Sequence, residues 1–348
     1  MKPIFRCELN YFPSPHLNQI YDGFEKLRKL GIINLTLNRA KGDINKPLLH
    51  VTIDNKYKVV YDTLDGLNWI NGSIEKNLEY FDKNLNADFY FKRSFSKQLL
   101  KYDTENRKIY PLGLNYYFQA EGNYPQSPKE KIKDVLKHNS IIAKFYNKTS
   151  FAHFEYENFP IPNKDKKILF LARLWNPDDE TNEHAKTLRE RINKNRIDYI
   201  KVCKKEFGDQ FVGGLQKDDF SSKHAKDLTV VNSLTRKENF MNLVKSTNIC
   251  IATSGLHNST GWKFAEYVAA SRAIVSEPLE YDLPGNFSQN KNYLIFQNEN
   301  ELISNINYLM QENDRLYEIM RNNFHYYNNY LSPDKLVLNT ILKIHQNQ

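Results

Sequence analysis

The sequence has few cysteines and no long apolar run. Only three of its 348 residues are cysteines, Cys7, Cys203 and Cys250, and they lie far apart. Sparse cysteines without metal-site spacing predict reduced core thiols in a cytoplasmic protein. No apolar run reaches the length of a membrane span, and the opening residues MKPIFRCELNYF lack the apolar core of a signal peptide. Membrane-spanning, secreted and cysteine-based functions are therefore not expected.

The sequence also lacks the signatures of nucleic-acid binding. It has no zinc or helix-turn-helix pattern and no compact Lys/Arg cluster interleaved with aromatic residues. The net charge is nevertheless +8, and residues 1–150 contain 24 Lys and Arg against 16 Asp and Glu, whereas residues 151–348 contain 25 of each. A basic N-terminal half predicts an anionic substrate or peripheral contact with an anionic membrane, on the inner face of the cell membrane. Charge that serves solubility alone is the alternative.

Strand and helix patterns alternate along the chain, which predicts an α/β protein with parallel sheets covered by helices. A length of 348 residues favours two domains. We place them at 1–155 and 156–330, followed by a terminal helix in 331–348 that begins at Ser-Pro-Asp. A Lys-rich helix is expected near 128–145. Strands are expected at 3–9, 32–37, 48–53, 57–61, 87–91, 109–112, 168–172, 210–214, 228–231, 249–252, 273–275 and 293–296, and long helices at 16–30, 184–206 and 236–245.

The most informative stretch is TSGLHNSTGWKFAEYVAASRAIVSEP, residues 253–278. It predicts a strand end, a Gly-bearing loop, a helix from Trp262 and a second short strand. Backbone N–H groups at the start of a helix are unpaired and suit a phosphate. Lys263 in the first turn is unfavourable unless an anion lies nearby, and Glu266 lies on the same helix face. The alternative is a solvated helix start with a local Lys263–Glu266 ion pair.

Arg173, Asn232 and Arg236 follow two other expected strands. Because parallel strands end at one edge of a sheet, these side chains could converge with the 253–278 loop on one crevice. A guanidinium fork, a lysine and a helix N-terminus would together hold a diphosphate. For Arg173 alone, the alternative is a surface ion pair with Asp178 or Asp179.

Three segments carry a family resemblance: LARL at 171–174, TRKENFMNLVKSTNICIATSG, and FAEYVAASRAIVSEP. They resemble the C-terminal half of GT-B glycosyltransferases, in particular the bacterial family 4 (group 1) enzymes, over residues 165–330. The resemblance implies two Rossmann-like doubly wound domains facing each other across a cleft, with the C-terminal helices crossing back. It also implies that the N-terminal domain binds the acceptor, that Arg173 binds the donor diphosphate, and that Glu266 binds the donor ribose.

Two departures from the family pattern matter. Asn258 stands where the pattern has the first Glu of E-x7-E, and Ser271-Arg272 replaces the usual Gly. Retention of the sugar configuration is therefore not carried over. Asn258 can still hydrogen-bond a sugar hydroxyl, and His257 could do likewise, although a lone loop histidine is commonly a bystander. The donor-binding candidates in this loop are therefore His257, Asn258, Ser259, Thr260 and Gly261.

A catalytic base, if the reaction inverts, should lie in the N-terminal domain. The candidates are His16, at a helix start that would keep it neutral, and Asp62 and Asp65 at a strand end. The alternatives are that His16 is an ordinary residue at a helix start and that Asp62 and Asp65 only form turns. Asp22, in the middle of the first helix, is expected to be exposed. The other major glycosyltransferase fold binds a metal through Asp-x-Asp; this chain has none, so no metal or other cofactor is expected.

These observations predict a metal-independent hexosyl-type glycosyltransferase. Its partners would be a nucleotide-sugar donor and a glycan or lipid-linked acceptor, in cell-surface polysaccharide or lipopolysaccharide biosynthesis. A non-catalytic nucleotide-sugar-binding subunit and a sugar-nucleotide epimerase of the same fold remain alternatives.

Overall fold

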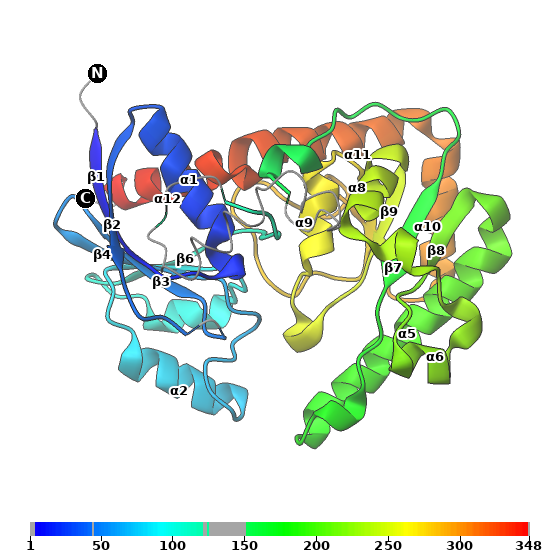
Figure 1. The fold of residues 1–348 in the computed structure, drawn as a ribbon, viewed down its shortest axis with the longest axis horizontal. Helices are drawn as coiled ribbons and strands as arrows, with labels where there is room; N and C mark the ends of the chain where they lie inside the picture. The colour runs from blue at the N-terminus through cyan, green and yellow to red at the C-terminus, as the bar shows by residue number, and fades with distance from the viewer. Residues whose placement is uncertain (1–3, 44, 121–123, 125–150, 347–348) are drawn as a thin grey trace, which may run out of the picture. The chain divides into compact units, whose positions relative to one another are not determined.

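The computed structural model describes residues 4–43, 45–120, 124 and 151–346. The chain divides into two compact units: an N-terminal unit of residues 1–155 with 330–348, and a C-terminal unit, Tyr156–Asn329 (Figure 1). Each unit has one β-sheet with helices, which confirms the expected α/β class. The Lys-rich helix expected near 128–145 lies outside the described residues.

The sheet of the N-terminal unit has the strand order β2-β1-β3-β4-β5-β6. All strands are parallel except β3, which is antiparallel to both β1 and β4. The expectation of parallel pairing is therefore wrong for β3. Its link to β4 is a tight turn in which Asp54 and Asn55 have φ of 53° and 56°, and parallel strands need a much longer crossover. The strands are β1 Phe5–Tyr11, β2 Ile33–Arg39, β3 Leu48–Ile53, β4 Tyr57–Asp62, β5 Phe89–Lys92 and β6 Lys108–Pro111.

Helices cover both faces of this sheet. Side chains alternate along a strand, so Val59 and Tyr61 of β4 pack toward α1 (Asn18–Lys29) and α12 (Pro333–His345). Val60 between them packs in a second core with α2 (Ile74–Asn84). The burial of both faces explains why the strand interior is apolar without polar alternation.

The terminal helix α12 belongs to the N-terminal unit, as the resemblance implies, and lies along α1 (Figure 1). Gly23 makes this close approach possible. A Cβ added there would lie 2.2 Å from the Pro333 carbonyl oxygen and 2.5 Å from Val337 Cγ2. Val337 and Ile341 on the facing side are fully buried.

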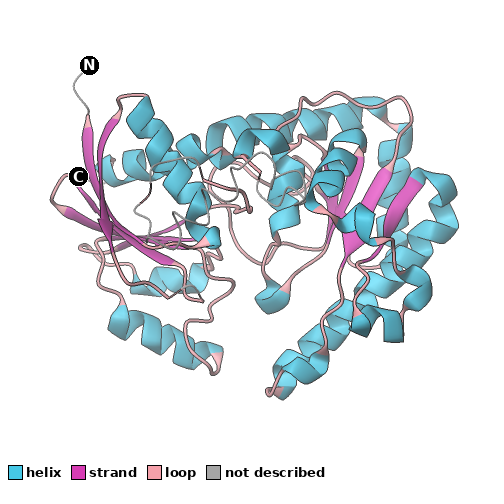
Figure 2. Cartoon of the chain, in the orientation of Figure 1, coloured by secondary structure: helices cyan, strands magenta, loops and turns pink. Residues whose placement is uncertain are grey.

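The C-terminal sheet is entirely parallel, with the order β11-β10-β9-β7-β8. Figure 2 shows helices on both of its faces, and β7, β9 and β10 are buried throughout. If the five strands are numbered 1 to 5 from β7 to β11 and the sheet is read from β8, their order is 2-1-3-4-5. The direction of winding therefore reverses between β7 and β9. The strands are β7 Ile168–Ala172, β8 Phe211–Leu215, β9 Ile249–Ala252, β10 Ala273–Ser276 and β11 Leu294–Ile295. The helices are α5 Glu183–Phe207, α6 Asp219–His224, α7 Asn232–Thr235, α8 Lys237–Ser246, α9 Trp262–Ala269, α10 Glu299–Gln311 and α11 Asn313–Tyr326, followed by a π-helical turn, Tyr327–Leu331.

The strand expected at 228–231 is wrong. A 3₁₀ turn, Lys226–Leu228, takes up the start of this apolar run, and only Thr229 forms a bridge, with Leu215. Asn232 and Arg236 therefore do not follow a strand. Asn232 begins α7 and Arg236 caps α8, and both side chains are exposed.

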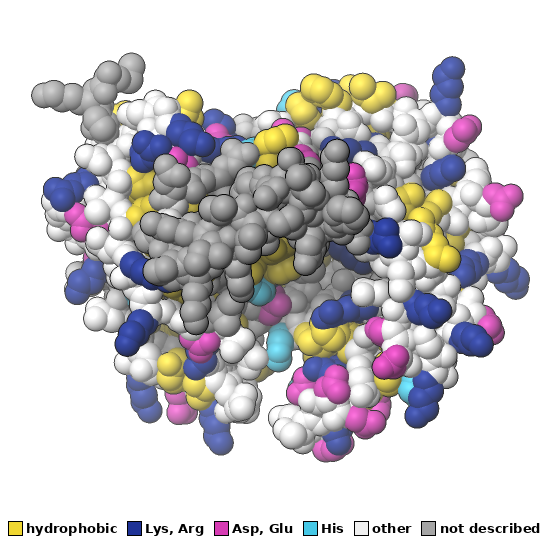
Figure 3. All heavy atoms as spheres, in the orientation of Figure 1, with side chains coloured by type: hydrophobic (Ala, Val, Ile, Leu, Met, Phe, Trp, Pro, Cys, Tyr) yellow, Lys and Arg dark blue, Asp and Glu magenta, His cyan; other side chains and the backbone are white. Residues whose placement is uncertain are grey.

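The described surface has no single basic patch on the face drawn in Figure 3. There, Lys and Arg side chains are interspersed with Asp and Glu. None of the helices in the described ranges is long and apolar enough to cross a membrane. The three cysteines are free and buried, as the sequence predicts.

Candidate functional site

The candidate site lies where β7 and β9 end, at the winding reversal of the C-terminal sheet. In open α/β sheets this is where ligands bind, because the loops on the two sides diverge and leave a crevice. The loop after β7 begins at Arg173, and the loop after β9 begins at Thr253.

A buried arginine of α5, Arg196, joins the two loops. Its guanidinium donates to the Arg173 carbonyl oxygen at 2.7 Å, to Thr253 Oγ1 at 3.2 Å and to the Ser254 carbonyl oxygen at 3.2 Å. Arg196 is 8% exposed, and burial lowers its pKa to about 10. The three hydrogen bonds of this buried guanidinium hold the loop after β7 and the loop after β9 at a fixed distance from each other.

The Arg173 guanidinium is exposed and stacks on an aromatic ring. Its Cζ lies 3.4 Å from the centroid of Trp175. Partial desolvation lowers its pKa. No described carboxylate lies within ion-pair distance of Arg173, although the charge of Asp218 acts on it and opposes the lowering of its pKa. Asp179 faces Arg189, at 3.6 Å. The alternative of a surface pair between Arg173 and Asp178 or Asp179 is therefore not observed.

Helix α9 starts beside these loops with an open N-terminus. Gly261 is its N-cap and no side chain caps it. A Cβ added to Gly261 would meet nothing within 4 Å. Within the first turn the Phe264 N–H donates to the Gly261 carbonyl oxygen at 3.1 Å. The positive end of the helix dipole therefore lies beside the loops without a side-chain cap, which favours an anionic ligand.

Lys263, in that first turn, points its ammonium group back to β7. The residue keeps an exposed surface, but Nζ donates to the Leu171 carbonyl oxygen. Desolvation of the ammonium, followed by repulsion from Arg196, lowers its pKa to about 8; Lys237 and Arg173 act in the same direction and Glu266 opposes them. The local Lys263–Glu266 ion pair is absent. Three carboxylates, Glu266, Glu277 and Asp218, oppose these four cations, so the site has a small excess of positive charge, which favours an anion.

Glu266 is buried in α9, at 3% exposure, with one carboxylate oxygen unoccupied. Oε1 accepts from Lys237 Nζ, the first residue of α8. Oε2 is buried and has no hydrogen-bond partner among the described residues. A buried carboxylate oxygen without a donor is costly, and a ligand hydroxyl would satisfy it.

The loop between β9 and α9 is tightly turned. His257 and Asn258 have left-handed φ of 56° and 55°, which asparagine tolerates better than histidine. Tyr281 donates to the His257 carbonyl oxygen at 2.9 Å, and the exposed Asn258 accepts from Arg191 at 3.4 Å. A small, partly open depression adjoins this loop, and its lining includes Ser254, Asn258, Ser259, Thr260, Gly261 and Ser276.

Sequence reasoning placed Asn232 and Arg236 in the donor site, but the structure records no contact between them and Arg173, Lys263 or Glu266. Their neighbour Lys237 reaches Glu266 instead. Sequence reasoning missed Lys237, Arg196 and Trp175. The signal for Arg196 was available: it lies in phase with the buried stripe of α5, three residues before Tyr199 and four before Ile200.

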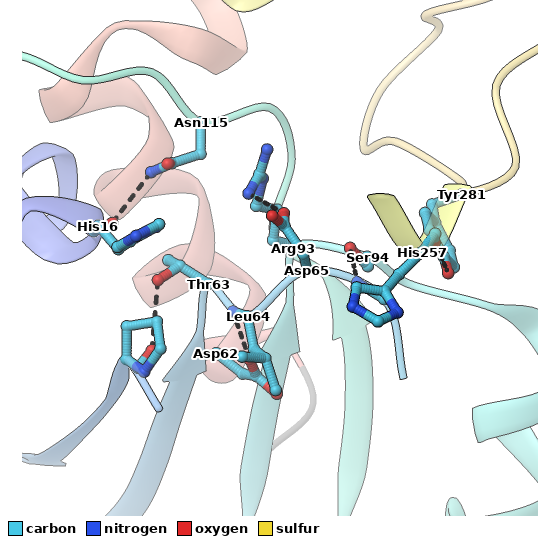
Figure 4. A network of polar contacts seen from close by, with 12 residues as sticks. His16, Asp62, Thr63, Leu64, Asp65, Arg93, Ser94, Asn115, His257 and Tyr281 are labelled. Atoms are coloured by element: carbon cyan, nitrogen blue, oxygen red, sulfur yellow. Dashed lines mark hydrogen bonds and ion pairs between the residues drawn. The ribbon is translucent and has the colours of Figure 1, made fainter. Parts of the chain in front are cut away.

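In the N-terminal unit, β1, β4 and β5 end at one edge, and the side chains after them form a polar network (Figure 4). Asp65 accepts from Arg93 at 2.5 Å, and Figure 4 shows the His16 ring directed toward this pair. Burial lowers the pKa of His16, Arg93 lowers it further, and Asp65 opposes them. Asn115 donates to the His16 carbonyl oxygen at 3.2 Å. The structure therefore brings His16 and Asp65 together.

Asp62 has a different environment. It is fully buried and accepts from the Leu64 backbone N–H at 2.8 Å, Trp69 Nε1 at 2.8 Å, Tyr90 Oη at 2.5 Å and Lys92 Nζ at 3.1 Å. A carboxylate occupied by four donors stabilises the loop and has no free oxygen to act as a base.

Asp22 also differs from expectation. It is fully buried, and its Oδ2 lies 3.2 Å from His153 Nδ1. Its position on the inner face of α1 explains why a mid-helix aspartate is not solvated here.

Comparisons with known proteins give no family match and no match among curated proteins. Solved structures do match. WaaG, described as a glycosyltransferase involved in lipopolysaccharide biosynthesis, is 10% identical with TM-score 0.40, covering 95% of this chain and 96% of its own. Anabaena Alr3699/HepE in complex with UDP-glucose is 10% identical with TM-score 0.38, covering 96% and 97%. The C-terminal domain of the Francisella tularensis group 1 glycosyl transferase LpcC is 11% identical with TM-score 0.35, covering 48% and 86%. Identities and TM-scores this low do not assign the chain to a family.

Proposed function

We propose that this protein is a glycosyltransferase that moves a sugar from a nucleotide-sugar donor to a glycan or lipid-linked acceptor in cell-surface polysaccharide synthesis. The observation that carries the proposal is the convergence of Arg173, Lys263 and Glu266 at the winding reversal of the C-terminal sheet. This arrangement pairs a place for a diphosphate with a buried acceptor for a hydroxyl, and a nucleotide sugar carries both groups.

In this proposal the C-terminal unit binds the donor. The Arg173 guanidinium, the Lys263 ammonium and the open start of α9 neutralise the diphosphate, both when it binds and when it leaves. Glu266 Oε2 accepts from a ribose hydroxyl. The departing charge is balanced by the protein's own cations, so we expect the reaction to proceed without a metal. Activity that survives excess EDTA supports this part; activity lost to EDTA and restored by Mg²⁺ or Mn²⁺ contradicts it.

The N-terminal unit would bind the acceptor at the edge that carries His16 and Asp65. The lowered pKa of His16 keeps its imidazole neutral near pH 7, where it can take a proton from an acceptor hydroxyl. We expect H16N to lower kcat at least 100-fold while leaving donor affinity unchanged. Turnover within threefold of the wild type would exclude His16 as the base.

The donor is identified by thermal shift against UDP-, GDP-, CMP- and dTDP-sugars, since a saturating ligand raises the melting temperature. Calorimetry with R173Q then tests the site, with R321Q on the exposed face of α11 as the matched control. R173Q should lose affinity at least tenfold and R321Q less than twofold. Equal affinities in all three proteins would reject the assignment.

Two alternative functions are separated by product analysis. A non-catalytic subunit binds the donor but gives no transfer with any acceptor tested. An epimerase converts the donor without an acceptor. Asn258 stands where the E-x7-E pattern has its first Glu, and its side chain contacts Arg191. This replacement is the reason to test the non-catalytic alternative.

A lipid-linked acceptor would bring the protein to a membrane. We assign that contact to the N-terminal half of the sequence, residues 1–150, which carries the excess of Lys and Arg. Sedimentation with phosphatidylglycerol vesicles should exceed that with phosphatidylcholine vesicles and fall as salt rises. Equal sedimentation with both vesicle types would exclude an electrostatic contact.

A further inference from the structure

The loop after β7 presents an aromatic ring to the arginine two residues before it. The Arg173 guanidinium carbon lies 3.4 Å from the ring centroid of Trp175, a face-to-face stacking distance. In an extended segment, residues i and i+2 project to the same side. The guanidinium is planar and weakly hydrated, so it can stack on an indole and still present its N–H groups at the edges.

The position of Trp175 is itself fixed by a buried amide. Asn193 of α5 accepts from the Trp175 backbone N–H at 2.8 Å and donates to its carbonyl oxygen at 2.6 Å. Asn193 is 7% exposed. One side chain therefore satisfies both backbone groups of Trp175 and ties the loop to a long helix, so the backbone that carries the ring is held in place.

A second arginine lies near the same ring, but its hydrogen bonds go elsewhere. Arg189 Cζ is 5.8 Å from the centroid. Its guanidinium donates to the Asn176 carbonyl oxygen at 2.6 Å and to Glu180, and it faces Asp179. Arg173 has no such partners among the described residues. The ring is thus the main constraint on the one guanidinium of this loop that is available to a ligand.

We propose that Trp175 is a positioning residue that holds the Arg173 guanidinium in its diphosphate-binding orientation before the donor arrives. This inference rests on the proposed donor role of Arg173. A pre-oriented arginine loses less conformational freedom on binding, so the ring contributes to affinity without touching the donor. Its contribution must therefore vanish when Arg173 is absent.

A double-mutant cycle tests this dependence, with UDP, GDP and dTDP as probes in calorimetry. W175L should weaken binding of the nucleotide that the wild type prefers by 5- to 20-fold, and W175F should stay within threefold because phenylalanine keeps an aromatic face. In the R173Q background, W175L should cause no further loss. An equal loss in both backgrounds, or no loss in W175L, would overturn the proposal.

A ligand-free measurement covers the case in which W175L folds poorly or no probe binds. In ¹⁵N-arginine-labelled protein, the Arg173 Nε–H resonance is assigned by its disappearance in R173Q. It should carry a ring-current shift in the wild type and W175F, and lose that shift in W175L. A resonance at the free-arginine position in the wild type overturns the stack itself. If the stack is present but neither wild type nor R173Q binds any nucleotide, the donor role fails and the positioning role falls with it.

Discussion

Replacing Arg196 with methionine should separate the two loops of the proposed donor site. The substitution keeps an apolar stem of similar reach and removes three hydrogen bonds, to the Arg173 and Ser254 carbonyl oxygens and to Thr253 Oγ1. Hydrogen bonds from a charged donor contribute ~1.5–3 kcal/mol each, so the loss is ~5–9 kcal/mol. Against this stands the cost of a buried charge: the Arg196 pKa is lowered to about 10, equivalent to ~3 kcal/mol.

The balance predicts that R196M lowers the free energy of unfolding by roughly 2–6 kcal/mol. For a unit of this size that corresponds to a fall in melting temperature of roughly 4–24 °C, which scanning calorimetry resolves. R321M on the exposed side of α11 is the matched control and should melt like the wild type. If R196M melts within about 2 °C of the wild type and binds donor equally well, Arg196 does not hold the loops.

Three further predictions concern packing and pH. G23A should destabilise the N-terminal unit by ~2–3 kcal/mol in urea unfolding, because its Cβ would lie 2.2 Å from the Pro333 carbonyl oxygen. At Gly31 an added Cβ meets nothing within 4 Å but φ is +71°, so G31A should cost only ~1 kcal/mol. Equal losses would refute the packing argument. The pKa of Lys263 is lowered to about 8, so its charge is lost as pH rises through 8. Donor affinity of the wild type should fall up to about tenfold between pH 7 and 9, and K263Q should bind weakly at every pH in that range. If the affinity of the wild type does not change between pH 7 and 9, the charge of Lys263 has no role in binding. R272M should lower the melting temperature by roughly 5–15 °C, since buried Arg272 donates to the carbonyl oxygens of Ala270, Thr247 and Phe159; a wild-type melt would show that these carbonyls need no partner.

The strands of the C-terminal unit could be predicted closely because both faces of its sheet are buried. Ile168–Ala172 and Ile249–Ala252 are uninterrupted apolar runs, and the structure gives them the predicted bounds. The run at 228–231 was predicted as a strand on the same ground, but only Leu228 in it is buried, Val231 is 64% exposed, and Thr229 forms only an isolated bridge. The antiparallel β3 was predictable in principle, since three residues between Ile53 and Tyr57 leave no room for a crossover.

The candidate site divides along the same lines. Arg173 and Lys263 could be placed from the sequence because one follows a strand and the other lies in the first turn of a helix at the same edge. Glu266 could be placed because it lies three residues after Lys263, on the same helix face. The partners of these residues are harder to predict. The burial of Arg196 could be read from its position in the apolar stripe of α5, but its hydrogen bonds to the two loops could not. The pairing of Glu266 with Lys237 rather than Lys263 depends on how α8 packs beside α9.

Ser271-Arg272 replaces a glycine of the pattern that the sequence resembles, and the structure explains the replacement where the sequence did not. Ser271 takes the left-handed conformation itself, at φ 56°. Arg272 beside it is fully buried and bonds to backbone carbonyls around the start of β10. The replacement therefore serves packing in the C-terminal unit.

The most direct test of the account is the affinity of the preferred nucleotide-sugar for E266Q, measured by calorimetry beside the wild type and R321Q. Glutamine keeps the shape of Glu266 but removes the charge that Oε2 offers to a ribose hydroxyl. Charge-assisted hydrogen bonds of ~1.5–3 kcal/mol predict a 10- to 100-fold loss of affinity, with R321Q unchanged. Affinity within twofold of the wild type in E266Q would contradict the donor site at the β7–β9 reversal.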